Sequence, residues 1–205
     1  MWGFPHNTAV PRITASERDA TRHRLLEAGK AEFAARGLAG ARFDQISLAA
    51  GHAKGTIYNY FDTKEHLFFT IVEDWCDQLV AGFVADQGRT AGGDLREIAR
   101  LDAEIARKDP DLARVIINQL PSLAAEHAAT TARAIEPGIQ LIASVISCGQ
   151  QRGEIATGHG PSTLARLFLA TLSAIEQEAL DDDTALTLDD VVSLTDELIV
   201  QGLHR

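Results

Sequence analysis

Apolar residues recur three or four positions apart through most of the chain, the spacing that places them on one side of an α-helix. Sustained alternation of apolar and polar residues, which would indicate a half-buried strand, does not occur. The pattern therefore predicts an all-α fold of about nine helices. We expect these helices near residues 16–36, 43–50, 54–61, 63–86, 94–108, 110–128, 130–152, 161–180 and 187–203.

Capping residues divide the pattern into separate helices. A side-chain oxygen followed three residues later by an acid predicts a helix start, because the oxygen accepts a free backbone N–H and the acid lies in the positive first turn. Proline at a first turn predicts further starts, whereas Pro121 is expected to kink or break its helix. The cap pairs are Ser16 with Asp19, Asp94 with Glu97 and Thr187 with Asp190, and the prolines follow Asp109 and Gly160.

Three segments are predicted to lie outside helices. Residues 1–13 contain two prolines and are expected to form a flexible arm, and residues 91–93 and 181–183 are expected to form loops.

Two short helices around Gly51 form the most informative segment. Gly51 can adopt the left-handed conformation that ends one helix and reverses the chain. In the helix before it, Phe43 and Ile46 belong to one apolar stripe, and in the helix after it, Ile57 and Phe61 can both face inward. Two helices that meet at a glycine turn are typical of a helix-turn-helix motif.

The outward side of the second short helix is polar in an unusual way. An ammonium, a small glycine, hydrogen-bond donors and aromatic rings suit the DNA major groove and its phosphate rims better than the glutamate and lysine mixture of an ordinary solvated face. The alternative is an amphipathic helix whose polar side simply contacts water. The residues concerned are Lys54, Gly55, Tyr58 and Asn59, flanked by Thr56 and Tyr60.

The segment over residues 16–70 resembles the DNA-binding domain of the tetracycline-repressor (TetR) family of bacterial regulators. The resemblance rests on many residue types at fixed spacing, whereas the remaining two thirds of the chain resemble the family only in being long and helical. The matching residues are Leu25, Leu26, Ala28, Phe33, Gly37, Ile46, Ala49, Ala50, Gly51, Gly55, Thr56, Ile57, Tyr58, Tyr60, Phe61, Lys64, Glu65 and Leu67.

The resemblance implies specific DNA contacts. The start of the recognition helix, Lys54 to Thr56, would meet base edges and nearby phosphates. Tyr58 and Lys64 correspond to residues that contact phosphate, and Tyr60 to one that contacts the DNA backbone or a thymine methyl. Glu65 is expected to stabilise the first turn of its own helix instead.

Three residues depart from the family pattern. Arg42 stands where a threonine or serine usually caps the second helix, and it either reaches a phosphate or makes no contact with DNA. His52 replaces a valine and is expected to be a half-buried core residue. Ala53 replaces a capping serine, at a cost of about 1 kcal/mol.

Charge is distributed unevenly between the expected domains. We expect an arm over residues 1–15, a DNA-binding domain over residues 16–62, and a ligand-binding and dimerisation domain over residues 63–205. Residues 1–67 contain 9 Lys and Arg against 7 Asp and Glu, whereas residues 68–205 contain 10 against 22. The excess of acidic residues therefore lies in the body, and the net charge of −10 of the whole chain does not argue against DNA binding by the head.

The body is expected to hold a small-molecule site. The helix at 63–86 follows the DNA-binding head directly and carries Trp75 on its apolar stripe, either as a core residue or as a pocket wall. An apolar pocket with few polar groups would favour a hydrophobic effector. Cys76 and Cys148 are expected to be buried free thiols. The pocket candidates are Trp75, Asn118, His127, Cys148 and Phe168.

The last two helices, 161–180 and 187–203, are candidates for a homodimer interface. Ala170, Ser173 and Ala174 would allow close approach of a second helix. Burial of both helices inside one chain is the alternative, and the family resemblance favours the dimer. A dimer matches an operator with two half-sites.

Other classes of protein find little support in the sequence. No catalytic motif, paired histidine metal motif or glycine-rich phosphate loop is present, so we expect no enzyme activity, no metal and no cofactor. With neither a signal peptide nor an apolar run of spanning length, a cytoplasmic protein without a membrane partner is expected. We predict a ligand-responsive repressor that binds a palindromic double-stranded operator. The alternative is a DNA-binding regulator of the same fold without a small-molecule ligand.

Overall fold

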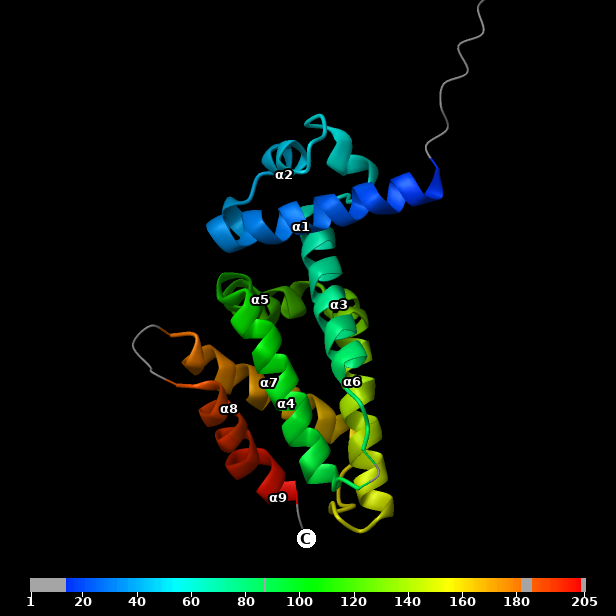
Figure 1. Cartoon of the computed structure of the whole chain (residues 1–205), viewed down its shortest axis with the longest axis vertical. Coiled ribbons are helices and arrows are strands. Elements are labelled where there is room, and N and C mark those ends of the chain that lie inside the picture. Colours follow the sequence, from blue (N-terminus) through cyan, green and yellow to red (C-terminus); the bar gives the residue numbers. More distant parts are fainter. Residues whose placement is uncertain (1–13, 87, 182–185, 204–205) are drawn as a thin grey trace, which may run out of the picture.

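The computed structural model describes residues 14–86, 88–181 and 186–203, and every regular element in these ranges is a helix (Figure 1). The prediction of an all-α fold is confirmed, while the expected arm at residues 1–13 lies outside the described residues. The elements are α1 (Ala15–Gly40), α2 (Phe43–Ala49), the 3-10 helix η1 (Thr56–Asn59), α3 (Lys64–Gly82), α4 (Ala91–Lys108), α5 (Pro110–Glu126), α6 (Ala128–Gln151), α7 (Pro161–Ala179), α8 (Leu188–Thr195), the π-helical turn η2 (Asp196–Val200) and α9 (Gln201–Leu203).

The molecule is elongated, with a small head at one end (Figure 1). Helix α1 lies across the head, with α2 and η1 on its outer side, and α3 leaves the head and runs into the body. In the body α6 packs against both α3 and α7, while α4 packs against α6 and α8. Helix α5 passes beneath the head and contacts α1. The long α3 therefore connects the outer elements of the head to the centre of the body.

Most helix starts follow the capping residues found in the sequence. The Asp109 side chain accepts from the N–H of Leu112 at 3.1 Å, Pro161 begins α7, and Thr187 forms a capping box with Asp190. The predicted cap at Ser16 is wrong by two residues. Thr14 caps α1 instead, because its hydroxyl accepts from the N–H of Glu17 while the Glu17 carboxylate accepts from the Thr14 N–H.

The expected loop at residues 91–93 is wrong, because these residues form the first turn of α4. The Thr90 hydroxyl accepts the N–H of Gly93 at 3.1 Å, so the helix is capped before the glycines and not at Asp94. Ala91 and Gly92 are buried, and this burial offsets the low helix propensity of glycine. The loop expected at residues 181–183 is described only at Asp181, which is not helical.

Pro121 does not break α5, which runs continuously to Glu126, and the alternative of a kink at Pro121 stays a prediction. Pro121 is exposed, so the carbonyl that loses its N–H partner can be solvated. Helix α6 likewise contains Pro137. In contrast, α1 is interrupted close to its predicted end, since Gly37 has a φ of +65°.

One hydrophobic cluster joins the head to the upper body. It contains fully buried Phe33 of α1, Phe61 and Phe68, together with Leu112 and Ile116 of α5. The rings of Phe33 and Phe68 meet edge to face with centroids 6.3 Å apart. Because the cluster spans α1, α3 and α5, the head does not have a core that is separate from the body.

A second cluster fills the lower body around Phe168, which is fully buried. Cys76 is buried as expected, but the expectation for Cys148 is wrong, because this residue is exposed. On α6 Cys148 is a helical neighbour of Ser144 and Gln151, which are also exposed, so it lies outside the buried stripe.

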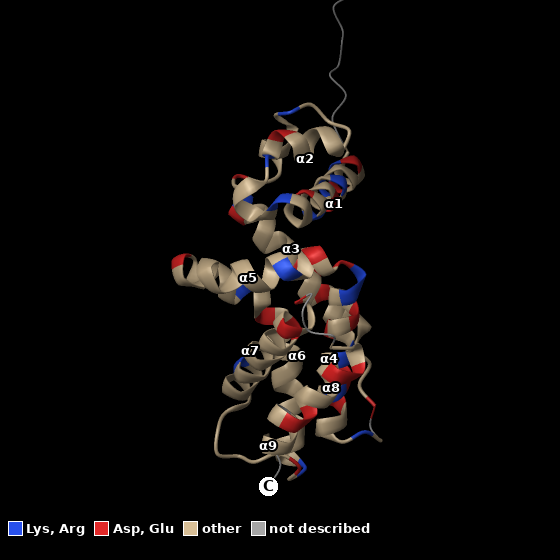
Figure 2. Cartoon of the chain, turned by 90° about the vertical axis from the view of Figure 1, so that its left-hand side faces the viewer, with Lys and Arg blue, Asp and Glu red and all other residues tan. Residues whose placement is uncertain are grey.

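Charged side chains follow the division expected from the sequence. Figure 2 shows acidic residues along the body helices and basic residues on α1 and in the loop at the tip of the head. Among the described residues, no helix combines the length and apolar character needed to cross a membrane.

Candidate nucleic-acid interface

The turn between α2 and η1 has the geometry predicted from Gly51. This residue has a φ of +79°, and its N–H donates to the carbonyl of Leu48 at 3.0 Å. The next N–H, that of His52, donates to the carbonyl of Ser47 at 2.9 Å. The left-handed residue thus reverses the chain immediately after α2, as glycine does at many helix ends.

A buried hydrogen bond that sequence reasoning missed joins the two short helices. The Ser47 hydroxyl oxygen accepts from the backbone N–H of Ile57 at 3.0 Å, and Ser47 is fully buried. This bond satisfies one of the N–H groups that a helix start leaves free. A serine beside the buried Ile46, on the inner side of α2, is the signal that could have revealed it.

The recognition element is shorter than predicted. It is a 3-10 helix over four residues, Thr56–Asn59, whereas the sequence predicted a helix over 54–61. The inward residues are as expected, since Ile57 and Phe61 are fully buried. The outer residues Lys54, Gly55, Tyr58 and Asn59 are exposed, and Thr56 and Tyr60 are half-buried.

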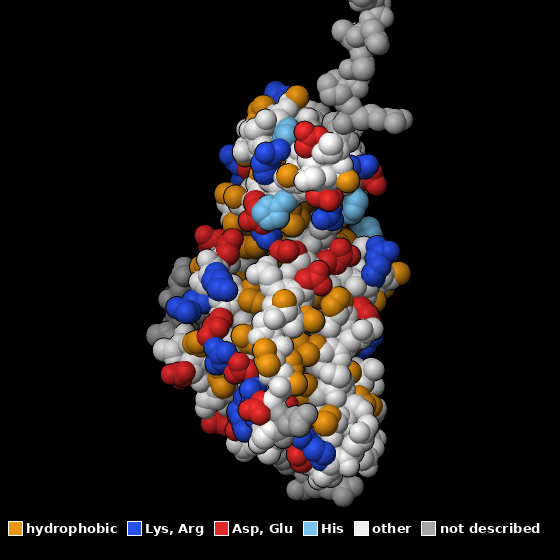
Figure 3. Space-filling view, turned by 45° about the vertical axis from the view of Figure 1, so that its right-hand side comes forward, with side chains coloured by type: hydrophobic (Ala, Val, Ile, Leu, Met, Phe, Trp, Pro, Cys, Tyr) orange, Lys and Arg blue, Asp and Glu red, His pale blue; other side chains and the backbone are white. Residues whose placement is uncertain are grey.

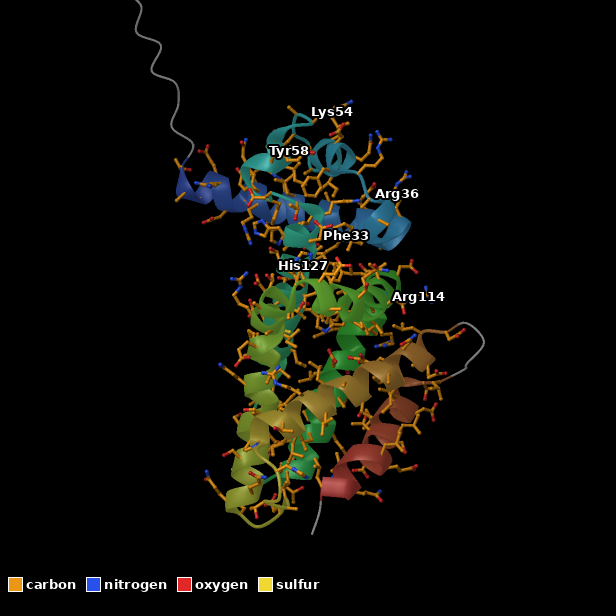
Figure 4. All side chains as sticks on the ribbon, turned by 180° about the vertical axis from the view of Figure 1, so that it is seen from behind. Phe33, Arg36, Lys54, Tyr58, Arg114 and His127 are labelled. Atoms are coloured by element: carbon orange, nitrogen blue, oxygen red, sulfur yellow. The ribbon has the colours of Figure 1, made fainter. Side chains whose placement is uncertain are left out.

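Lys54 and Tyr58 lie on the outer side of the head, with Lys54 at the tip (Figure 4). Tyr58 is 56% exposed, yet its ring packs edge to face on Phe43 with centroids 5.4 Å apart. The contact fixes the ring while most of the side chain stays accessible. Such a rigid, accessible phenol suits a contact with a phosphate.

A groove of about 520 Å³ lies beside η1. Its basic group is Arg18 of α1, whose guanidinium lies 6.0 Å from the centre of the Tyr60 ring. His52 is half-buried, as expected, and its Nε2 is a buried atom without a hydrogen-bond partner in the described part of the chain. The sequence analysis did not select Arg18. The groove is lined by Arg18, Thr21, His52, Thr56, Asn59 and Tyr60.

Arg42 begins α2 without a side-chain cap, as its residue type requires. Its backbone N–H donates to the carboxylate of Glu32 at 3.1 Å, a bond that the side chain of the third helical residue accepts in a capping box. The Glu32 carboxylate also pairs with Arg36, at 3.2 Å from its Nε. The Arg42 side chain remains exposed, and a phosphate contact stays a prediction.

Lys64 at the start of α3 has a partner within the head. Its Nζ donates to the carbonyl of Ala39 at 2.9 Å, near the end of α1. A phosphate contact by Lys64 therefore stays a prediction that must be reconciled with this bond. Glu65 lies in the first turn of α3, as expected, and Thr63 caps the helix by accepting from the N–H of His66 at 3.1 Å.

Comparison with known proteins agrees with this geometry. Residues 25–71, from α1 to the first half of α3, match the model of the family described as bacterial regulatory proteins, tetR family. This segment belongs to the TetR family. The resemblance noted from the sequence is confirmed for the head.

Two curated relatives match part of the chain. The HTH-type transcriptional regulator SrpR of Pseudomonas putida is 28% identical over 110 residues, which are 54% of this chain and 52% of the relative. The HTH-type transcriptional repressor SCO4008 of Streptomyces coelicolor is 43% identical over 61 residues, which are 30% of this chain and 32% of the relative. The chain thus matches about half the length of the first relative and a third of the second.

Solved structures resemble the chain over nearly its whole length. FadR from Bacillus subtilis, in complex with stearoyl-CoA, has a TM-score of 0.75 at 22% identity, covering 89% of this chain and 99% of FadR. SmeT, the repressor of the Stenotrophomonas maltophilia multidrug efflux pump SmeDEF, has a TM-score of 0.66 at 18% identity, covering 91% and 93%. The body therefore shares the fold of these regulators.

Of the expected pocket residues, Trp75 lies at a hollow inside the body. This inner hollow, of about 70 Å³, lies between α3, α4, α5, α6 and α7. The indole Nε1 of Trp75 donates to Oδ1 of Asp102 at 2.7 Å. The wall also contains Glu176 of α7, and the sequence analysis selected neither acid.

The other four candidates lie elsewhere. Phe168 is fully buried in the lower core, Cys148 is exposed, and Asn118 is exposed beside a surface hollow between α5 and α7. His127 is exposed at the junction of α5 and α6, beneath the head, where its ring lies 6.0 Å from that of Phe69 (Figure 4).

Proposed function

We propose that this chain is a transcriptional repressor that binds a two-fold symmetric DNA operator as a dimer and is released by a small molecule. The observation that carries the proposal is the exposure of Lys54, Gly55, Tyr58 and Asn59 on one outer surface of a TetR-family head. A short helix that presents such side chains after a tight turn suits entry into the major groove.

The charge pattern supports DNA binding by the head. Figure 3 shows basic side chains on the head together with uncharged and a few acidic ones, and several acidic side chains where the head meets the body. Arg18 lines the groove beside the recognition element and Lys54 lies at the tip of the head, and both would meet phosphates of the duplex. The acidic body would be repelled by the same phosphates, so binding would be confined to the tip.

An exposed apolar stripe on α7 supports a homodimer. Leu167 is 59% exposed, and Ala170 and Ala174 follow it at helical spacing on the exposed side. On η2, Leu198 is 64% exposed. Small and apolar residues on one helix face let a second helix approach closely. A second copy of the chain would cover this stripe and place two recognition elements on one operator.

Helix α3 would couple the body to the head. Asp74, next to Trp75, forms an ion pair with Lys30 of α1, with Oδ2 and Nζ 2.7 Å apart. Above this pair, Phe68 packs on Phe33 of α1. A ligand that shifts α3 near Trp75 would therefore move α1 and the recognition element, provided that it binds the shifted state better.

The size of the inner hollow favours the alternative of a regulator that has no small-molecule ligand. Its volume of about 70 Å³ is well below the ~300–1,000 Å³ that encloses a drug-sized ligand. A regulator of this fold controlled by a partner protein would have such a body. Release from DNA by a small molecule alone, in a purified system, separates the two possibilities.

The DNA-binding proposal can be tested without a known operator. Duplexes are selected from a random pool by the parent protein, and the affinity of one selected duplex is then measured for variants. Lys54→Ala and Tyr58→Phe are expected to bind several-fold to more than tenfold more weakly. Arg133→Ala, which removes an exposed charge from α6, is the control and should bind like the parent. Equal binding by all four proteins would overturn the proposal.

A further inference from the structure

Two carboxylates lie buried in the body, one on α4 and one on α7. Asp102 is 5% exposed and Glu176 is 4% exposed. Asp102 accepts the bond from the Trp75 indole, but Oε1 of Glu176 is a buried atom with no hydrogen-bond partner among the described residues. Both side chains line the inner hollow next to Trp75.

Neither carboxylate is neutralised by a basic side chain. Within residues 14–86, 88–181 and 186–203, no Lys or Arg forms an ion pair with Asp102 or Glu176. Burial raises the pKa of Asp102, and burial together with repulsion from Asp102 raises the pKa of Glu176. Ionisation of a buried acid without a counter-ion is costly, so a bound cation would stabilise the ionised form of both acids.

The surroundings of the two acids are apolar. The inner hollow is lined mainly by aliphatic and aromatic side chains, among them Val72, Leu79, Ile116 and Leu169. Glu176 also borders an outer hollow of about 230 Å³ between α4, α7 and α8. This outer hollow lies at the surface, because Arg107 and Thr187, which also line it, are exposed. Glu176 thus lies between an opening at the surface and the interior next to Trp75.

We propose that the effector is a hydrophobic organic cation, such as an aryl-alkyl amine, whose charged group lies between Asp102 and Glu176. Its apolar part occupies the two hollows on either side of Glu176. This inference rests on the proposed ligand-responsive function and specifies its ligand class.

The same two acids disfavour other ligand classes. A carboxylate or phosphate group placed between Asp102 and Glu176 would meet negative charge, because no Lys or Arg of the described residues lines the inner hollow and the Arg107 of the outer hollow is exposed. The stearoyl-CoA complex of FadR from Bacillus subtilis therefore indicates the fold of this body and not its ligand. A neutral ligand would leave Oε1 of Glu176 unpaired or would have to donate a hydrogen bond to it.

The test compares three probes that share one carbon skeleton: phenylpropylamine, phenylpropanol and phenylpropionate. Each is titrated into the full-length chain without DNA, by calorimetry and by tryptophan fluorescence. A Trp2→Phe background leaves Trp75 as the only tryptophan, so the emission reports on the proposed site. We expect the amine to bind about tenfold or more tightly than the alcohol, and the propionate to bind most weakly.

Variants of the two acids test whether these residues cause the preference for the amine over the alcohol. Glu176→Gln and Asp102→Asn are each expected to reduce the preference for the amine over the alcohol about tenfold. Glu104→Gln changes an acid two residues from Asp102 on α4 that pairs with Arg100, and it should keep the preference.

Any one of three results would overturn the inference. They are equal affinity for the amine and the alcohol, no binding of the amine at millimolar concentration, and an unchanged preference for the amine in the folded Glu176→Gln protein. If a variant fails to fold, the selectivity of the parent among the three probes still decides. Because these titrations contain no DNA, their failure leaves the DNA-binding proposal intact, and loss of operator binding leaves the ligand assignment intact.

Discussion

The side-chain oxygen of Ser47 accepts a hydrogen bond from the backbone N–H of Ile57, with 3.0 Å between the two atoms. The bond crosses the Gly51 turn and connects the inner side of α2 to the recognition element. Both residues are fully buried, so no water can replace the hydroxyl if it is removed.

Ser47→Ala is therefore expected to lower the free energy of unfolding by about 1–3 kcal/mol, because it leaves a buried N–H without an acceptor. Urea denaturation followed by circular dichroism measures the change. Ser16→Ala, an exposed site in the first turn of α1, should stay within about 0.5 kcal/mol of the parent. A Ser47→Ala protein as stable as Ser16→Ala would show that the bond contributes nothing to the turn.

Substitutions at two glycines of the same segment are expected to affect different properties, stability at one and DNA binding at the other. Gly51 has a φ of +79°, so Gly51→Ala strains the backbone and is expected to cost about 1–2 kcal/mol of unfolding free energy. Gly55 has a φ of −83° and open space around its Cβ position, so Gly55→Ala should leave stability nearly unchanged. The added methyl group would instead lie on the proposed DNA surface and weaken operator binding.

Thermal melts and binding titrations on both proteins test this separation. If Gly55→Ala bound selected DNA as tightly as the parent, the surface around Gly55 would not approach the duplex. If Gly51→Ala were as stable as Gly55→Ala, the left-handed conformation would not be required at the turn.

The buried acids predict a pH dependence of stability. Burial, offset only in part by the Trp75 hydrogen bond, raises the pKa of Asp102 to about 6. A carboxyl whose pKa is raised on folding contributes stability below its unfolded pKa of about 4 and loses it as the pH rises through its folded pKa. The parent is therefore expected to lose on the order of 2 kcal/mol at this site between about pH 4 and about pH 7.

The double variant Asp102→Asn, Glu176→Gln should show a smaller decline over the same interval, because neither amide titrates. Glu104→Gln provides the control for removal of one carboxylate from α4. Unfolding free energies at several pH values measure the difference. Parallel profiles for the parent and the double variant would contradict the assignment of the pH dependence to this pair.

Close packing around Gly149 gives a further prediction. A Cβ at this position of α6 would lie 2.5 Å from Cβ of Ala91 and 2.8 Å from Cδ1 of Ile155. Gly149→Ala is therefore expected to destabilise the protein by about 1–3 kcal/mol, although alanine favours helices. Gly202→Ala in α9, where nothing lies within 4 Å, should be neutral or stabilising. A Gly149→Ala protein as stable as the parent would indicate that α4 and α6 pack less closely here.

Local chemistry in the sequence was sufficient to predict most of the fold. Side-chain caps and prolines defined the starts of α5, α7 and α8, and Gly51 defined the turn. These signals act over a few residues, so they are readable without tertiary structure. Where a stronger cap lay nearby, as at Thr14 and Thr90, the predicted start was displaced.

The acid pair could not be predicted because helix packing brings its members together. Asp102 and Glu176 are 74 positions apart in the sequence, on α4 and α7, and an isolated acid on a helix usually faces water. A weaker signal was present. Glu176 lies four residues after Leu172, and Asp102 lies four residues after Ile98, so both acids occupy buried stripes of their helices.

The salt dependence of operator binding tests the central claim most directly. Affinity of the parent for a selected duplex is measured at several salt concentrations and compared with that of Lys54→Ala and Arg133→Ala. If the tip of the head contacts phosphates, the parent affinity falls steeply with salt, and Lys54→Ala shows a shallower slope by about 1 on a double-logarithmic plot. If the parent, Lys54→Ala and Arg133→Ala proteins all had the same slope, the DNA contacts would have to lie elsewhere, and this result would contradict the account.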